Sequence, residues 1–201
     1  RFLGLGNSDD PEGAVWTGSN ETGFSIMNTA SYNLKDDDIK EMDQEGNLMR
    51  KALRVCKTVQ DFEHFLDTLP RPMRVEANFG VIDAYGGAAY YETNNERYYK
   101  KDANDPNLAP EGYLIYTNFS FEGRTDEGKG YVRYENAKKI FKEMRDGKYG
   151  LYRNPRREIR HESGIDNDVD CLGISSYLCR YSSLGENGKG AKRFSYLRRI
   201  L

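Results

Sequence analysis

Residues 76–104 constrain the fold of this chain more than any other segment. Three β-rich runs, ANFGVIDAY, AAYYET and RYYKKDAN, are separated by a Gly86-Gly87 turn and an Asn94-Asn95 turn. Short turns of these residue types join antiparallel neighbours, so we predict a meander. VIDAY and AAYYE are apolar on both faces, which indicates strands covered by a second sheet on one side and by helices on the other. The predicted fold class is α+β.

Two β-rich runs precede the meander and predict a hairpin. AVWTGSN at 14–20 and GFSIMNTAS at 23–31 are joined at Glu21-Thr22, a spacing and composition typical of a hairpin. The sequence opens without Met on a strand-like RFLGLG run, so we expect the natural chain to begin upstream.

Two helices are predicted between the hairpin and the meander. Apolar residues recur at helical spacing in LMRKALRVC, which ends at Cys56. The second helix is opened by Thr58, whose side chain can cap it while Asp61 takes the reciprocal capping-box position. The apolar stripe of this helix consists of Val59, Phe62, Leu66 and Leu69.

After the meander, YLIYTNFSF at 113–121 predicts a further strand. An amphipathic helix follows, ending at Gly147 and marked by Tyr134, Ala137, Ile140, Phe141 and Met144. From about residue 150 the sequence has little periodicity, so residues 150–201 are assigned to no element. We predict a single domain over residues 1–201 that is incomplete at both ends.

The charge balance argues against several kinds of partner. Lys and Arg number 30 against 32 for Asp and Glu, so no overall positive field favours nucleic acid. No apolar run approaches the roughly 18 residues of a membrane span. The first residues lack the regions of a signal peptide. A signal further upstream would direct export, so the compartment stays open, as does assembly into a homo-oligomer.

The three cysteines do not predict a metal site. Cys56, Cys171 and Cys179 match no zinc-binding spacing, and we expect no metal and no cofactor. Cys56 lies in a run of helical apolar periodicity, so we interpret it as a small buried apolar residue.

Two asparagines at strand ends are the candidate chemical groups. Asn28 lies in GFSIMNTASYNL and Asn118 in YLIYTNFSFEG, each beside small hydroxyl residues in β-rich sequence. For either asparagine taken alone, the sequence favours a structural role, in a turn or in a bond from the side chain to the backbone, over a chemical one. Composition does not decide between these roles.

The segment NETGFSIMNTASYN resembles the N-E-x-G hairpin of choloylglycine hydrolases and of acyl-coenzyme A:6-aminopenicillanate acyltransferase-like proteins. The resemblance continues in the same order through VQDFEHFL, FGVIDAYGGAAYYET, KKDAND and YLIYTNFSFEG, and covers roughly residues 1–145. It implies a four-layer αββα sandwich of antiparallel sheets, the fold of N-terminal-nucleophile (Ntn) hydrolases.

The resemblance also implies a chemistry. In this family the first residue of the processed chain is a Cys whose own α-amino group serves as its base. The thiol attacks an amide carbonyl and gives a thioester acyl-enzyme, which water or an acceptor amine resolves. The implied substrate is a small molecule with a linear amide bond, either peptide-like or not. An α-amine titrates near neutral pH, so it can accept the thiol proton without a histidine.

The resemblance assigns roles to particular residues. Asn28 and Asn118 are placed in the oxyanion hole, where amide donors meet the negative charge that develops on the carbonyl oxygen. Tyr32 and Asn33 are candidates for the acyl pocket, although a core position explains Tyr32 equally well. Arg133 is a substitute for a family arginine, and an exposed helix charge is the alternative explanation for it.

The chain departs from the family pattern in three places. Position 1 is Arg, and the nucleophilic Cys with its nearby Arg and Asp is absent from these 201 residues, so we expect them to be inert alone. Choloylglycine hydrolases have an arginine where Gly130 stands here. Residues after about 150 do not resemble the family. The alternative hypothesis is a binding module without catalytic activity, which uses a Tyr-rich surface for a glycan or a protein.

Overall fold

The computed structural model describes residues 1–145 and the strand at residues 177–179. Six strands form one antiparallel sheet in the order β1-β2-β3-β4-β5-β6, and a second sheet pairs β7 with β8. The strands are β1 (Phe2–Gly6), β2 (Val15–Asn20), β3 (Ser25–Ala30), β4 (Ala77–Ile82), β5 (Ala88–Thr93), β6 (Tyr98–Asp102), β7 (Tyr113–Ile115) and β8 (Tyr177–Cys179). The helices are α1 (Glu45–Val55), α2 (Val59–Thr68) and α3 (Tyr131–Arg145). The α+β class and the antiparallel pairing are confirmed.

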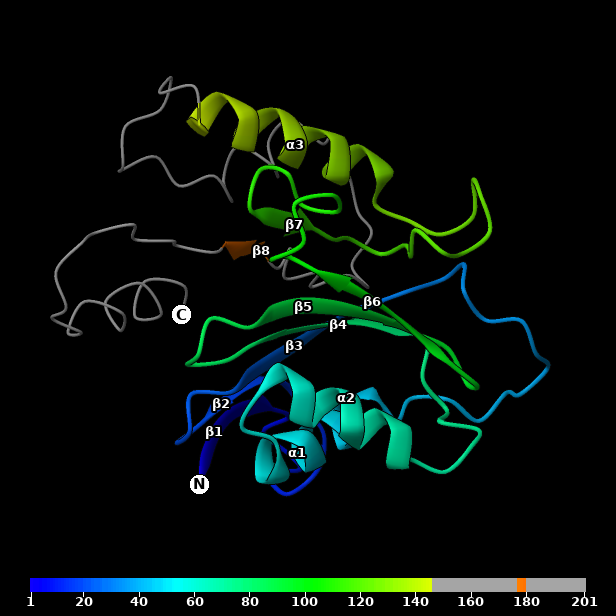
Figure 1. Cartoon of the computed structure of the whole chain (residues 1–201). Helices are drawn as coiled ribbons and strands as arrows, with labels where there is room; N and C mark the ends of the chain where they lie inside the picture. The colour runs from blue at the N-terminus through cyan, green and yellow to red at the C-terminus, as the bar shows by residue number, and fades with distance from the viewer. Residues whose placement is uncertain (146–176, 180–201) are drawn as a thin grey trace, which may run out of the picture.

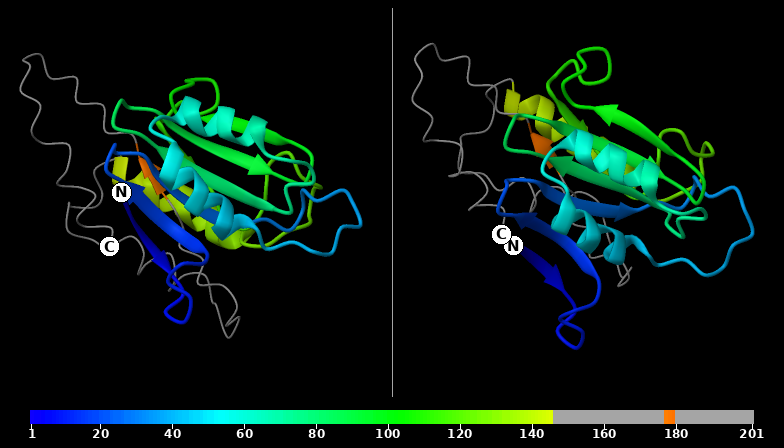
Figure 2. Two further views of the ribbon diagram at one scale, coloured as in Figure 1. Left: turned by 90° about the horizontal axis from the view of Figure 1, so that it is seen from below. Right: turned by 60° about the horizontal axis from the view of Figure 1, so that its bottom comes forward.

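The helices lie on both sides of the large sheet. Figure 1 shows α1 and α2 against one face, with β7, β8 and α3 beyond the other. Figure 2 shows α1 and α2 lying across the sheet, with β1 at its edge. The second sheet has only two strands of three residues each in the described part of the chain. The complete four-layer αββα sandwich therefore remains a prediction.

The main core lies between the large sheet and the helix pair. Phe62 of α2 is fully buried and its ring contacts Phe24, Phe79 and Tyr91, which come from three different parts of the sheet region. The apolar stripe predicted for the second helix faces this core, with Val59, Phe62 and Leu66 buried and Leu69 partly buried against them. Burial of such large side chains contributes the dominant stabilising term of a domain of this size.

The opposite face of β4 and β5 is covered as well. Tyr90 of β5 stacks on Tyr116 with ring centroids 4.0 Å apart, and Ala88 and Ala103 pack around this pair. The burial of β4 and β5 on both faces is thus confirmed. Tyr116 lies just after β7, so a segment without regular structure covers this face beside the short second sheet.

Local sequence signals account for the ends of α2 and for the first hairpin. The Thr58 side chain accepts from the Asp61 amide, and the Asp61 carboxylate accepts from the Thr58 amide, which is the predicted capping box. In the β2–β3 turn, Gly23 has φ +87°, a conformation that favours glycine. The Asn20 amide donates to the carbonyls of Leu53 and Cys56 and so ties the hairpin to the end of α1.

Two predicted elements differ from the structure. The strand predicted over 113–121 extends only from Tyr113 to Ile115, because side chains rather than a neighbouring strand hold the backbone after Ile115. The last helix begins at Tyr131, before its first predicted apolar residue, with the amide of Tyr134 donating to Gly130. The predicted helix end at Gly147 and most of the unassigned segment 150–201 lie outside the described residues.

Within the described part of the chain, no helix combines the length and the apolar character that a bilayer crossing requires.

Candidate functional site

Asn118 lies buried in the irregular segment that follows β7. Its side chain is 4% exposed. The Nδ2 group donates to the backbone oxygen of Ala30 at the end of β3 over 2.9 Å, and the Asn118 carbonyl accepts from the Lys129 amide over 3.0 Å. The sequence left open whether Asn118 has a structural role, and the structure shows that its side chain does bond to the backbone. The second Nδ2 hydrogen has no acceptor among the described residues.

Arg133, near the start of α3, completes the environment of Asn118. Its Nη2 donates to Asn118 Oδ1 over 2.7 Å, and the side chain is half-buried rather than free in solvent. A guanidinium only donates, so the oxygen of the Asn118 amide must face Arg133 and the nitrogen must face away. The structure thus brings together two of the residues that the sequence selected.

Gly130 makes this contact sterically feasible. Its φ is +86°, and a Cβ atom built there would lie 2.9 Å from Arg133 Nη2 and 2.9 Å from the Thr117 side chain. A larger residue at position 130 would displace the guanidinium from Asn118. Gly130 is therefore part of how Arg133 reaches Asn118.

Asn28 is not brought to the same place. It pairs with Phe79 across β3 and β4, and Phe79 belongs to the core under α1 and α2. Residues directly opposite one another in an antiparallel pair share a face, so the Asn28 side chain lies on the helix side. Asn118 reaches Ala30 from the segment that packs on the other face. Asn28 is half-buried, and its side chain forms no hydrogen bond to a described residue.

The two acyl-pocket candidates have different environments. Tyr32 is 42% exposed, and the Lys129 ammonium lies 5.2 Å from its ring centroid, so Tyr32 is not a core residue. Asn33 is buried, and its amide donates to the carbonyls of Ser120 and Arg124 while its oxygen accepts from the Ser120 amide. Asn33 therefore holds the segment after Asn118 in place, whereas Tyr32 lies at the surface close to Lys129.

Cys56 is a buried apolar residue, as predicted. It is 1% exposed and packs in the core between α1, α2 and the sheet. Burial, followed by the nearby Asp61 carboxylate, raises the pKa of the Cys56 thiol to about 12. Since the thiolate is the reactive form of a cysteine, burial makes Cys56 a poor nucleophile.

We expect Cys56 to resist alkylation until the protein unfolds. With a pKa of about 12, only about one thiol in ten thousand is ionised at pH 8, against roughly a quarter in an unfolded chain. Iodoacetamide labelling at pH 8, with and without urea, followed by mass spectrometry of the Cys56 peptide, measures this. Equal labelling rates in the two conditions would contradict the buried position.

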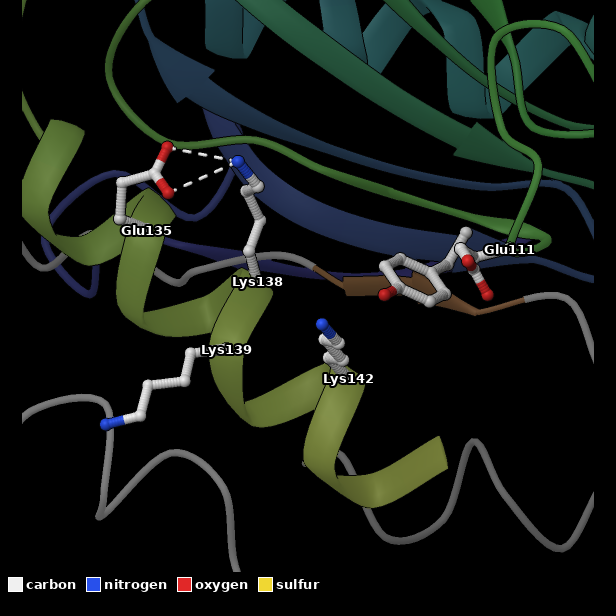
Figure 3. Close-up of a pocket in the computed structure, with 6 residues that line it drawn as sticks. Glu111, Glu135, Lys138, Lys139 and Lys142 are labelled. Carbon is white, nitrogen blue, oxygen red and sulfur yellow. Dashed lines mark hydrogen bonds and ion pairs between the residues drawn. The ribbon is translucent and has the colours of Figure 1, made fainter. Parts of the chain in front are cut away.

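A surface pocket of about 540 Å³ lies elsewhere, between α3 and the start of β7. Its walls are Glu111, Tyr113, Glu135, Lys138, Lys139 and Lys142, and none of these is a residue that the sequence selected. Figure 3 shows the α3 residues along the helix, with Glu135 bonded to Lys138. Glu111, Tyr113 and Lys139 each take part in an interaction within the chain. We assign no ligand to this pocket, because its volume and its charged walls do not point to a particular chemical group.

Comparison with known proteins gives a limited result. No protein-family model and no curated protein matches the chain. Among solved structures, it is similar to a variant of conjugated bile acid hydrolase from Clostridium perfringens, with a TM-score of 0.39 and 19% sequence identity. The superposed part covers 51% of this chain and 35% of the hydrolase, so the chain spans only about a third of that protein. The family suggested by the sequence motifs remains a prediction.

Sequence reasoning missed the polar residues that surround the Asn118 segment. Glu92 and Asn78 are both fully buried on the sheet face that this segment covers, and both bond to it. A buried polar group must find hydrogen-bond partners, so such residues indicate a fixed polar contact. One feature of the sequence could have indicated this contact. AAYYET, a run predicted to be buried on both faces, contains a glutamate.

Proposed function

We propose that this chain supplies the oxyanion-binding core of a cysteine Ntn amide hydrolase or acyltransferase that acts on linear amides. The complete protein would have the four-layer αββα fold, with its nucleophilic cysteine outside these 201 residues. The proposal rests on the sequence resemblance and on one structural observation, the orientation of the Asn118 carboxamide by Arg133.

That orientation matters because an oxyanion hole needs fixed donors. Arg133 bonds to Asn118 Oδ1 at 2.7 Å, and Ala30 accepts one Nδ2 hydrogen at 2.9 Å. The amide is therefore held at both ends, and the guanidinium draws electron density from its oxygen, which makes the remaining N–H a stronger donor. Such a preorganised donor typically contributes roughly 2.7–4 kcal/mol to transition-state stabilisation.

The proposed reaction has two steps. The cysteine thiol gives its proton to the α-amine, the sulfur bonds to the amide carbonyl carbon, and negative charge develops on the carbonyl oxygen beside Asn118. The C–N bond then breaks as the leaving amine takes the proton, which leaves a thioester. In the second step water or an acceptor amine bonds to the thioester carbonyl carbon and the C–S bond breaks. The sulfur regains a proton, and a carboxylic acid or a new amide is released.

The first test is the N-terminal residue of the mature protein made from its complete reading frame. Intact-mass and terminal-peptide analysis should find Cys at that position, and incubation with linear amides should add an acyl mass to it. The panel contains conjugated bile salts, N-acyl amino acids and penicillins. A mature chain that starts with none of Cys, Ser and Thr would remove the catalytic proposal and leave the binding module.

The binding-module hypothesis gains no specific support from the described residues. Tyr90, Tyr91 and Tyr116 are core residues, whereas Tyr32, Tyr85 and Tyr131 are the tyrosines most exposed in that part of the chain. Of these exposed rings, Tyr131 stacks on Phe119 and Tyr32 lies under Lys129. Two of the three are thus engaged in contacts within the chain.

A further inference from the structure

Glu92 is a buried carboxylate on the central strand β5. It is fully buried and lies on the sheet face opposite α1 and α2, between Tyr90 and the segment after β7. No Lys or Arg among the described residues forms an ion pair with it. A carboxylate without a neighbouring cation in such a site depends on hydrogen bonds to offset its desolvation.

Among the described residues, Glu92 accepts three side-chain hydrogen bonds, and all three come from one segment, residues 116–122. Oε1 accepts from the Tyr116 hydroxyl over 2.7 Å and from the Phe121 amide over 3.0 Å, while Oε2 accepts from the Glu122 amide over 2.9 Å. Burial, followed by the Glu92 carboxylate, holds the pKa of Tyr116 well above its ordinary value, so the hydroxyl keeps its proton and donates. All three partners are donors, so both Glu92 oxygens act as acceptors.

Two sheet-side asparagines hold the middle of the same segment. Asn78 donates to the Phe119 carbonyl over 2.9 Å and accepts from the Ser120 hydroxyl over 2.7 Å. Asn33 bonds to both the amide and the carbonyl of Ser120. These contacts replace the ladder of a neighbouring strand, and they fix the chain immediately after Asn118, while Tyr116 is fixed before it.

We propose that Glu92 is a positioning residue, which sets the place of the Asn118 donor by clamping residues 116–122 on both sides of it. Its consequence for turnover rests on the function proposed above. A shift of a donor by about 1 Å can lower a rate about 100-fold, so loss of the clamp should reduce kcat more than it changes KM.

Glu92→Gln is the informative variant, studied in the protein from the complete reading frame. A glutamine keeps the shape but has one oxygen, so its NH₂ group must face a backbone N–H of Phe121 or Glu122. We expect hydrogen exchange in residues 119–123 to become about 10-fold faster or more, with exchange in β4 unchanged. We also expect kcat to fall about 10–100-fold, with KM within about 3-fold of the wild type.

Glu63→Gln is the matched control. Glu63 of α2 accepts from the Tyr91 hydroxyl over 3.1 Å and from Lys100 over 2.7 Å, so it is also a carboxylate that accepts from a buried tyrosine hydroxyl, but on the opposite face of the sheet. We expect this variant to leave both kcat and exchange in residues 119–123 unchanged.

The two readouts separate this inference from the proposed function. Unchanged exchange in Glu92→Gln overturns the clamp even if the wild type cleaves amides. Faster exchange with unchanged kcat in an active protein overturns the positioning role. A wild type that cleaves no amide, combined with faster exchange in the variant, removes the proposed function and supports the clamp.

Discussion

Asn118→Ala is expected to lower kcat for amide cleavage by roughly 10²–10³-fold, with little change in KM. The lost amide stabilises the oxyanion of the transition state more than the neutral carbonyl of the substrate, so the effect appears in kcat. The measurement is steady-state turnover of the best linear amide found for the complete protein. Thermal unfolding is recorded in parallel, because the variant also loses the bonds to Ala30 and Arg133.

Two further variants make the result specific. Asn118→Asp retains an acceptor for Arg133 but donates no hydrogen bond and sets an oxygen against the Ala30 carbonyl, so kcat should fall at least as far, and thermal unfolding is recorded for this variant too. Asn107→Ala removes an exposed asparagine whose side chain bonds to the nearby Asp105, and this variant should leave kcat unchanged. If Asn118→Asp turned over at the wild-type rate, Asn118 would not be an oxyanion donor.

Asn28→Ala distinguishes the arrangement predicted from the sequence from the one in the structure. The sequence resemblance pairs Asn28 with Asn118, whereas the β3–β4 register directs Asn28 toward the side of α1 and α2. A donor on the wrong side of a sheet cannot reach the same oxygen, so the structure predicts a loss in kcat of less than about 3-fold. A loss similar to that of Asn118→Ala would place both amides in one oxyanion hole.

The elements that could be predicted from the sequence are those with local causes. The capping box of Thr58 and Asp61 and the turn at Gly23 depend on neighbours only a few residues away, and both are present. The burial of β4 and β5 on both faces could also be predicted from the sequence, because both runs are apolar on each face. Their pairing with each other and with β6 then follows from the short turns between them.

The parts that could not be predicted depend on distant residues. Residues 116–121 have strand-like composition, but Glu92, Asn78 and Asn33 supply their backbone partners from elements far away in the sequence. The face on which Asn28 lies depends on register, and a shift of one residue would reverse it. The contact between Arg133 and Asn118 depends on the turn at Gly130. A positive φ at this glycine cannot be predicted from hydrophobic periodicity.

The main core offers the largest expected effect on stability, at Phe62. Its ring lies 5.2 Å from Tyr91, 6.0 Å from Phe24 and 6.1 Å from Phe79, measured between centroids, and it is fully buried. Phe62→Ala removes these contacts and leaves a cavity that a rigid sheet cannot close, so we expect a loss of roughly 3–5 kcal/mol in the free energy of unfolding. Urea denaturation followed by circular dichroism measures this loss.

Phe65→Ala provides the comparison within the same helix. Phe65 is only partly buried and its ring contacts Phe62 alone among the described aromatic residues, at 6.2 Å, so its loss should reach no more than about 2 kcal/mol. If Phe62→Ala does not fold, Phe62→Leu retains most of the volume and should cost about 1–1.5 kcal/mol. Equal losses at positions 62 and 65 would mean that α2 packs on the sheet through a different face, and the core described between α2, β3, β4 and β5 would then be wrong.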